Sequence, residues 1–137
     1  MTIFRSRMRG LYTLVVYSLC TLCVPAVLVA QQPLVVPSGQ PLSFLEFIAE
    51  DDAQVVRFRF VAPQIGETFG FEDVMQDFQV ICDEQVMPVL DANGLAPRQI
   101  ILSMSAADVP FGELAPDVLQ FFELFRPENG ICIWEEF

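Results

Sequence analysis

The feature that most constrains this chain is an uncharged apolar run that follows a cationic start. Because of it, we expect the first thirty residues to take no part in the folded domain. Three arginines within the first nine residues precede the apolar stretch 11–24, and the small residue Ala30 follows it. This order of cationic, apolar and small residues is typical of a secretory signal peptide. We expect a signal helix over this run and cleavage between Ala30 and Gln31.

An uncleaved membrane anchor is the alternative, because residues 11–30 are just long enough to span a bilayer. Polar residues and Pro25 dilute this stretch, which favours cleavage. Cleavage would divide the chain into a signal peptide, residues 1–30, and one exported domain, residues 31–137. In both cases the sequence predicts that residues 31–137 are periplasmic or secreted; an uncleaved chain would be anchored in the inner membrane and face the periplasm.

The exported part is strongly acidic. It contains all eighteen acidic residues and only four arginines, so its formal charge is −14. A protein with this charge repels nucleic-acid phosphates and anionic lipid surfaces. We therefore expect no nucleic-acid partner, and contact with a membrane only through an uncleaved N-terminal segment. The partners that remain are a periplasmic or envelope protein, or a small ligand.

The missing residue types exclude several kinds of active site. The sequence has no histidine and no lysine, which excludes Ser-His-Asp triads, histidine-containing zinc sites and Schiff bases. We expect no cofactor, no metal ion and no catalytic residue. A small carboxylate-based hydrolase using Glu50, Asp51 or Asp52 is the enzyme alternative, but a solvated acidic loop explains the same three residues.

Cys82 and Cys132 are the two cysteines that remain after cleavage. An even pair in an exported chain indicates one disulfide. Closing a loop of this length would stabilise the fold by about 4 kcal/mol in the chain-entropy model. Two buried free thiols are the alternative.

Apolar spacing predicts a strand–helix–strand unit in the middle of the chain. Residues 55–61 alternate between apolar and charged side chains, which indicates a half-buried strand. Apolar residues then recur at helical spacing over residues 72–91, with a kink expected at Pro88. Residues 100–104 predict a buried strand. A strand–helix–strand connection of this kind is expected to pair the two strands in parallel.

The segment before this unit predicts two short elements. Residues 34–36 can form an edge strand. Ser43 and Glu46 match the Ser-x-x-Glu capping box, so we expect a short helix over residues 44–50.

The C-terminal segment predicts a hairpin of residues 119–126 and 131–137. The Pro-x-Asn-Gly sequence between them suits a type I turn with the glycine in the left-handed conformation. A helix over residues 117–124 is the alternative for the first arm. Taken together, the elements predict an α+β two-layer sandwich, with a mixed sheet of about four strands and one long helix on one face.

Several side chains are candidates for binding. Twelve phenylalanines lie in the exported part, which is enough to leave some exposed at an interface. The candidate interface residues are Trp134, Phe137, Phe111 and Phe71. For Trp134 we favour packing in the core near the disulfide, and the interface anchor is the alternative. Arg57 and Arg59 share one strand face and form a candidate anion-binding pair, although ion pairs with the surplus acids are the favoured explanation.

Three motifs carry a resemblance to a known family: Val-Pro-Ser-Gly-Gln at residues 36–40, Val-Pro-Phe-Gly at 109–112 and Gly-Ile-Cys-Ile-Trp-Glu-Glu-Phe at 130–137. The chain resembles a family of small exported alphaproteobacterial proteins that carry a domain of unknown function. The resemblance implies a bacterial, periplasm-facing protein and implies no activity. We expect a non-catalytic domain that binds a protein or a small ligand; a membrane-anchored accessory subunit of an envelope complex and the small hydrolase are the alternatives.

Overall fold

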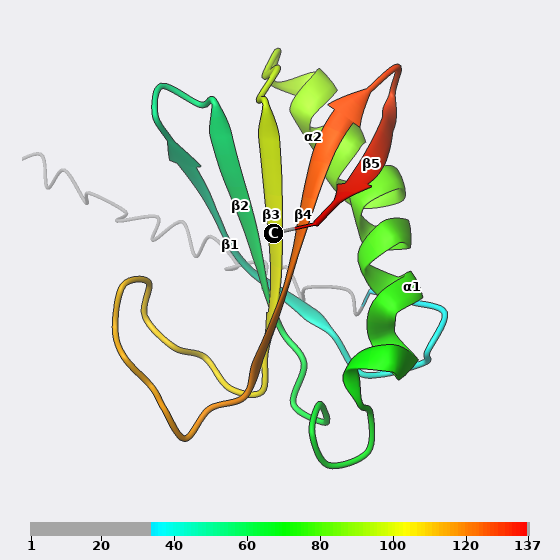
Figure 1. The fold of residues 1–137 in the computed structure, drawn as a ribbon, viewed down its shortest axis with the longest axis vertical. Coiled ribbons are helices and arrows are strands. Elements are labelled where there is room, and N and C mark those ends of the chain that lie inside the picture. Colours follow the sequence, from blue (N-terminus) through cyan, green and yellow to red (C-terminus); the bar gives the residue numbers. More distant parts are fainter. Residues whose placement is uncertain (1–33, 137) are drawn as a thin grey trace, which may run out of the picture.

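The computed structural model describes residues 34–136, and over these residues the fold is α+β. Five strands form one mixed sheet in the order β1-β2-β3-β4-β5, with a long helix packed against it (Figure 1). The predicted signal helix, the predicted cleavage site between Ala30 and Gln31, and Phe137 lie outside the described residues.

The bounds of the elements follow the predicted order, with one additional strand at the start. The strands are β1 (Ser43–Glu50), β2 (Val55–Val61), β3 (Gln99–Ser105), β4 (Gln120–Glu128) and β5 (Ile131–Glu135). The helix consists of α1 (Phe71–Ile81), a π-helical turn η1 (Cys82–Val86) and α2 (Met87–Ala92).

The predicted helix over residues 44–50 is wrong, and this error explains why the sheet has five strands instead of four. The segment forms β1, which pairs antiparallel with β2. Phe44 and Phe47 are three residues apart, which imitates helical spacing. A β-bulge between Phe44 and Glu46 nevertheless places both rings on one face of the strand. There they pack on Phe60 and Phe58 of β2, with ring centroids 5.7 and 5.0 Å apart.

The predicted strand–helix–strand unit is confirmed. β2 and β3 pair in parallel from Val55 opposite Gln99 to Val61 opposite Ser105. The apolar stripe of the helix packs on the sheet, and its buried members include Val74, Phe78 and Leu90. This packing gives the chain the two layers that the sequence predicts.

The helix widens in its middle rather than breaking at Pro88. In η1 the N–H of Met87 donates to the carbonyl of Cys82, which is five residues earlier. Pro88 has no N–H of its own, so it removes one of the ordinary helical hydrogen bonds next to this turn. Such a turn is one of the few ways in which a helix accommodates a local change of hydrogen bonding.

The predicted hairpin of β4 and β5 is confirmed, but its turn type is not the one predicted. Asn129 and Gly130 have φ of 53° and 82°, so both central residues are left-handed. Two left-handed central residues define a type I′ turn, which matches the twist of the paired strands better than type I. The predicted edge strand at residues 34–36 is also wrong, because that segment is irregular.

A buried carboxylate attaches the segment before β1 to the helix. Asp77 of α1 has no exposed surface. It accepts hydrogen bonds from the N–H and the hydroxyl of Ser38, at 2.9 and 2.6 Å, and from the side-chain amide of Gln40, at 2.7 Å. The Val-Pro-Ser-Gly-Gln motif therefore supplies the donors that let a carboxylate stay in the core.

We predict that Asp77→Ala lowers the free energy of unfolding by about 2–3 kcal/mol, because buried donors lose their acceptor. Urea denaturation measures the difference. The control is Asp91→Ala, which removes an exposed acid of the same helix and should change stability by less than about 0.5 kcal/mol. Equal midpoints for the two variants would contradict the structural role of Asp77.

Candidate functional site

An apolar groove lies where the helix does not cover the sheet. It has a volume of about 420 Å³ and runs between strands β1 and β2 and the η1–α2 part of the helix. We call it the phenylalanine groove. It is lined by Phe44, Phe47, Phe58, Phe60, Leu34, Gln85, Val89, Asn93 and Leu95.

The walls of the phenylalanine groove combine buried and exposed rings. Phe58 and Phe60 are buried and form its floor, whereas Phe44 and Phe47 are each 38% exposed. Val89 of α2 is likewise exposed on the helix side. Within residues 34–136, β1 is at the edge of the sheet and pairs only with β2. The groove is therefore open along an edge strand, with apolar surface ready to be covered.

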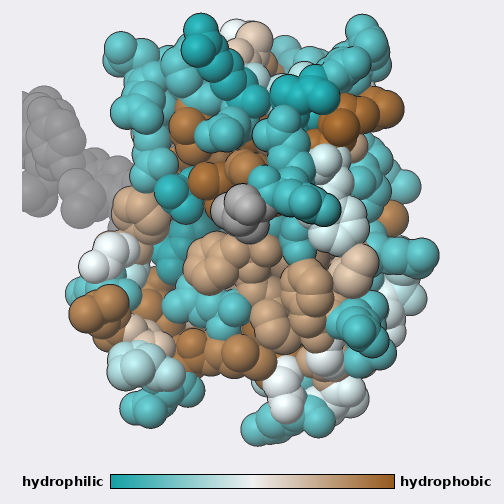
Figure 2. All heavy atoms as spheres, viewed as in Figure 1, coloured by the Kyte–Doolittle hydropathy of each residue, from teal (hydrophilic) through white to brown (hydrophobic). Residues whose placement is uncertain are grey.

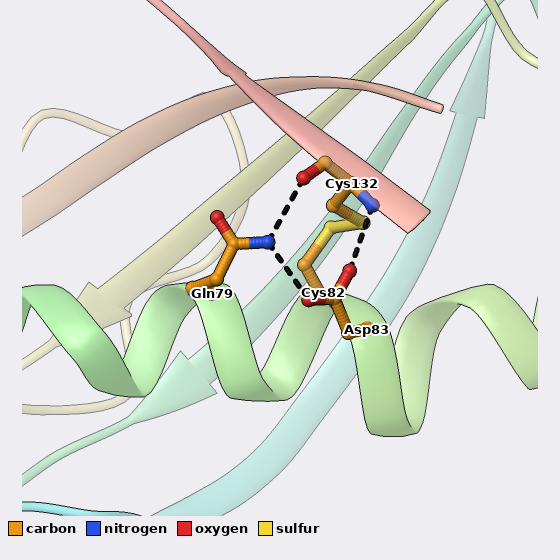
Figure 3. Close-up of a disulfide and its surroundings, with 4 residues drawn as sticks. All are labelled: Gln79, Cys82, Asp83 and Cys132. Atoms are coloured by element: carbon orange, nitrogen blue, oxygen red, sulfur yellow. Dashed lines mark hydrogen bonds between the residues drawn. A yellow bond between two sulfur atoms is a disulfide. The ribbon is translucent and has the colours of Figure 1, made fainter. Parts of the chain in front are cut away.

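The groove exists because the helix is attached at the other edge of the sheet. Cys82 of η1 and Cys132 of β5 form a disulfide, and Gln79 and Asp83 flank it (Figure 3). The amide of Gln79 donates to the Cys132 carbonyl at 2.9 Å, and the Cys132 N–H donates to the Asp83 carboxylate at 2.7 Å. The helix thus binds both polar backbone groups of one residue of β5.

This arrangement explains why a proline is tolerated inside β4. Pro127 pairs with Cys132, and in this two-residue hairpin the register makes that pair a non-hydrogen-bonded one. Cys132 consequently directs its N–H and carbonyl away from β4 and toward the helix. Pro127 loses no ladder bond, and the helix side chains satisfy an edge that would otherwise be open to pairing.

The candidate anion-binding pair is already occupied by the protein's own groups. Arg57 pairs with Glu50 at 3.0 Å, and Arg59 pairs with Glu46. The guanidinium of Arg59 also donates to the Val109 carbonyl. Phe111 lies over both arginines, with its ring centroid 5.7 Å from each guanidinium carbon. An anion would have to displace these partners, so the geometry gives anion binding no support.

Two of the candidate interface residues, Phe71 and Phe111, are partly exposed but already make packing contacts. Phe71 is 37% exposed and meets Phe121 edge-on at 5.4 Å. Phe111 is 50% exposed and covers the arginine pair. In the view of Figure 2, apolar side chains gather over the lower part of β3 and β4, and hydrophilic side chains lie at both ends of the molecule.

Trp134 also remains open to solvent. It lies on the face of β5 that carries Cys132, as strand alternation predicts, and is 43% exposed. Its ring is tilted against Phe125 at 6.4 Å. The indole is therefore only half packed in the core, and one part of its surface is available to a ligand.

The acids of the hydrolase alternative lie at the end of β1 and in the turn that follows it. Asp51 and Asp52 are exposed in the β1–β2 turn, where their φ values are 49° and 54°. Glu50 is paired with Arg57. An arginine therefore holds Glu50, while Asp51 and Asp52 face solvent.

Glu123 of β4 is a functional candidate that the sequence analysis did not identify. It lies between Phe121 and Phe125 on the face of β4 toward the helix and is 5% exposed. Burial raises the pKa of its carboxyl group, and a hydrogen bond from the Trp134 side chain lowers that pKa by less. Strand alternation through the two phenylalanines was the signal that could have found it.

The described residues give neither a metal site nor a membrane span. Among residues 34–136, no group of three or more cysteine, aspartate or glutamate side chains is arranged to hold a metal ion. No helix in the same range is long and apolar enough to cross a bilayer.

Comparison with known proteins identifies the family. A family model described as "Family of unknown function (DUF6497)" matches residues 20–137, which include every described element. The chain belongs to this family. No curated protein and no solved structure matches the chain.

We predict that loss of the disulfide lowers the free energy of unfolding by about 4 kcal/mol, because the two cysteines are 50 residues apart and the bond restricts the unfolded chain. Guanidinium denaturation of the oxidised protein and of the Cys82→Ala/Cys132→Ala variant measures this. Adding dithiothreitol should destabilise the former and leave the latter unchanged. Equal stability of the oxidised protein and the variant would contradict the prediction.

We predict that Glu123→Gln stabilises the fold at pH 7. Because the pKa of Glu123 is raised in the folded state, ionisation costs more there than in the unfolded chain. The advantage of the variant should shrink as the pH falls through the folded pKa and vanish below about 4, where unfolded glutamate is protonated too. Thermal denaturation between pH 3 and 8 tests this, with exposed Glu113→Gln as the control that shows no such trend.

Proposed function

We propose that this protein is an exported, non-catalytic binding domain whose phenylalanine groove holds an apolar small molecule. The observation that carries this proposal is the groove of about 420 Å³, with four phenylalanines among its nine lining residues. Sites for small molecules are usually concave, mostly apolar and of about 300–1,000 Å³. The groove meets all three conditions.

The chemistry of the lining supports an apolar ligand. Among residues 34–136, no charged side chain lines the groove, and the amides of Gln85 and Asn93 are the polar side-chain groups in its lining. Two amides can orient a ligand, whereas the rings supply the affinity. Covering apolar surface contributes about 25 cal/mol per Å², and Phe44 and Phe47 both leave surface to cover.

An extended peptide is the second candidate occupant. β1 is an edge strand, and an incoming strand can add to such an edge while its side chains enter the adjacent groove. The bulge between Phe44 and Glu46 interrupts the regular ladder on this strand, which is why we place the small molecule first.

Export is supported by two independent features. The first is the cationic and apolar order of the first thirty residues. The second is the Cys82–Cys132 disulfide, which persists in oxidising compartments. An alphaproteobacterial periplasmic location fits both. A membrane-anchored accessory subunit differs from this proposal only in keeping its leader.

We predict that the fluorescent apolar probe N-phenyl-1-naphthylamine binds the groove saturably, with an increase in emission. Phe47→Gln should weaken binding about tenfold, because an aromatic contact worth about 1–1.5 kcal/mol is lost. The matched control is Phe122→Gln, since Phe122 is 45% exposed but lies outside the groove. Equal affinities of the two variants, or no saturable binding, would overturn the proposed site.

We predict that the protein purified from the periplasm begins at Gln31, so that its intact mass lacks residues 1–30. Mass spectrometry after alkylation without reduction shows both whether residues 1–30 are present and whether the cysteines are free thiols. An intact leader in the membrane fraction would favour the anchored subunit. Recovery from the cytoplasm with both Cys82 and Cys132 alkylated would rule out export.

A further inference from the structure

A buried negative charge without a positive partner marks a second site. Glu123 is 5% exposed, and it lines a pocket together with Trp134. A buried carboxylate usually has a cation beside it, because desolvation without a counter-charge is costly. Glu123 has none among the described residues.

The arginines of the described residues cannot supply this charge. Arg57 and Arg59 pair with Glu50 and Glu46 on the other face of the sheet. Arg126 is bound by Glu128 and Glu135.

Arg98 immediately precedes β3, whereas Glu123 pairs with Leu102 of that strand. Strand geometry thus places Arg98 about 13 Å along β3 from Leu102, the residue that pairs with Glu123. The positive end of α1 is occupied as well, because the carboxylate of Asp73 accepts the N–H of Gly70 there at 2.8 Å.

The space beside Glu123 has aromatic and acidic walls. A pocket of about 500 Å³ is lined by Phe71, Glu123, Trp134, Glu135 and Glu136, and we call it the aromatic–acid pocket. It lies where β5 ends: Glu135 pairs with Leu124, so β4 has no partner in β5 from Glu123 backward. Phe71 at the start of α1 also lines it. None of its lining residues belongs to the phenylalanine groove.

We propose that the aromatic–acid pocket binds an organic ammonium cation, with Glu123 as its counter-charge and the rings of Phe71 and Trp134 against its alkyl groups. Aromatic faces attract ammonium groups, most strongly when the cation is desolvated. Two aromatic rings in the lining fit a quaternary ammonium better than a metal ion, which requires several oxygen ligands.

Two further features favour this ligand class. The pocket lining offers carboxylate groups and aromatic rings, so a cation that donates no hydrogen bond still meets a counter-charge and aromatic surface there. The acidic part of the chain, with a formal charge of −14 for residues 31–137, attracts cations from solution and repels anionic competitors. A bound cation would also remove the penalty that now raises the pKa of Glu123.

The chain contains one tryptophan, so its fluorescence reports directly on the proposed site. Titration with choline at constant ionic strength should give a saturable change in the emission of Trp134. The neutral isostere 3,3-dimethyl-1-butanol has the same shape without the charge and should give at least tenfold weaker binding. An equal response to both compounds, or no saturable response to choline, would overturn the proposal.

Two variants separate charge from shape in the same titration. Glu123→Gln should weaken choline binding at least tenfold and leave the response to the neutral isostere unchanged, whereas Glu113→Gln in a distant loop should bind as the parent does. Phe71→Leu keeps an apolar wall but loses the ring, and should weaken choline alone. Unchanged choline affinity in Glu123→Gln, with the fold verified by circular dichroism, would contradict the assignment. Because the two sites share no residue, either proposal can fail while the other stands.

Discussion

The attachment of the helix to β5 decides the character of this molecule. Five strands spaced about 4.8 Å apart are nearly twice as wide as one helix with a diameter of about 10 Å, so one helix cannot cover the whole face. The disulfide between Cys82 and Cys132, with the hydrogen bonds from Gln79 and to Asp83, holds the helix at the β5 edge. The uncovered strip must then lie over β1 and β2, and there the structure has its phenylalanine groove.

Two buried carboxylates show how the same group can serve different purposes. Asp77 accepts three hydrogen bonds from Ser38 and Gln40 and joins the first described segment to the helix. Glu123 is almost as deeply buried, but among residues 34–136 it has no ion pair with an arginine. A carboxylate with a full set of donors stabilises a fold, whereas one without a counter-charge destabilises it until a cation arrives. The contrast is the reason for assigning a binding role to Glu123 alone.

The three motifs behind the family resemblance each occupy a junction of the fold. Residues 36–40 supply the donors to Asp77. Residues 109–112 close over the arginine pair through the Val109 carbonyl and the ring of Phe111. Residues 130–137 contain Cys132 and Trp134, and therefore the disulfide and one wall of the aromatic–acid pocket. In the described part of the chain, residues of all three motifs thus take part in packing or charge pairing.

The sequence by itself determined the α+β class, the strand–helix–strand unit and the terminal hairpin, because apolar periodicity reports which face of an element is buried. It also excluded histidine- and lysine-based chemistry. Tertiary structure alone decided that residues 43–50 form a strand, since the Ser43 capping signal is local and the pairing of Phe44 and Phe47 with β2 is not. The same holds for both candidate sites. The groove depends on where one helix sits on a wider sheet. The lack of a counter-charge at Glu123 depends on which acids the few arginines reach. Neither is a property of any short stretch of sequence.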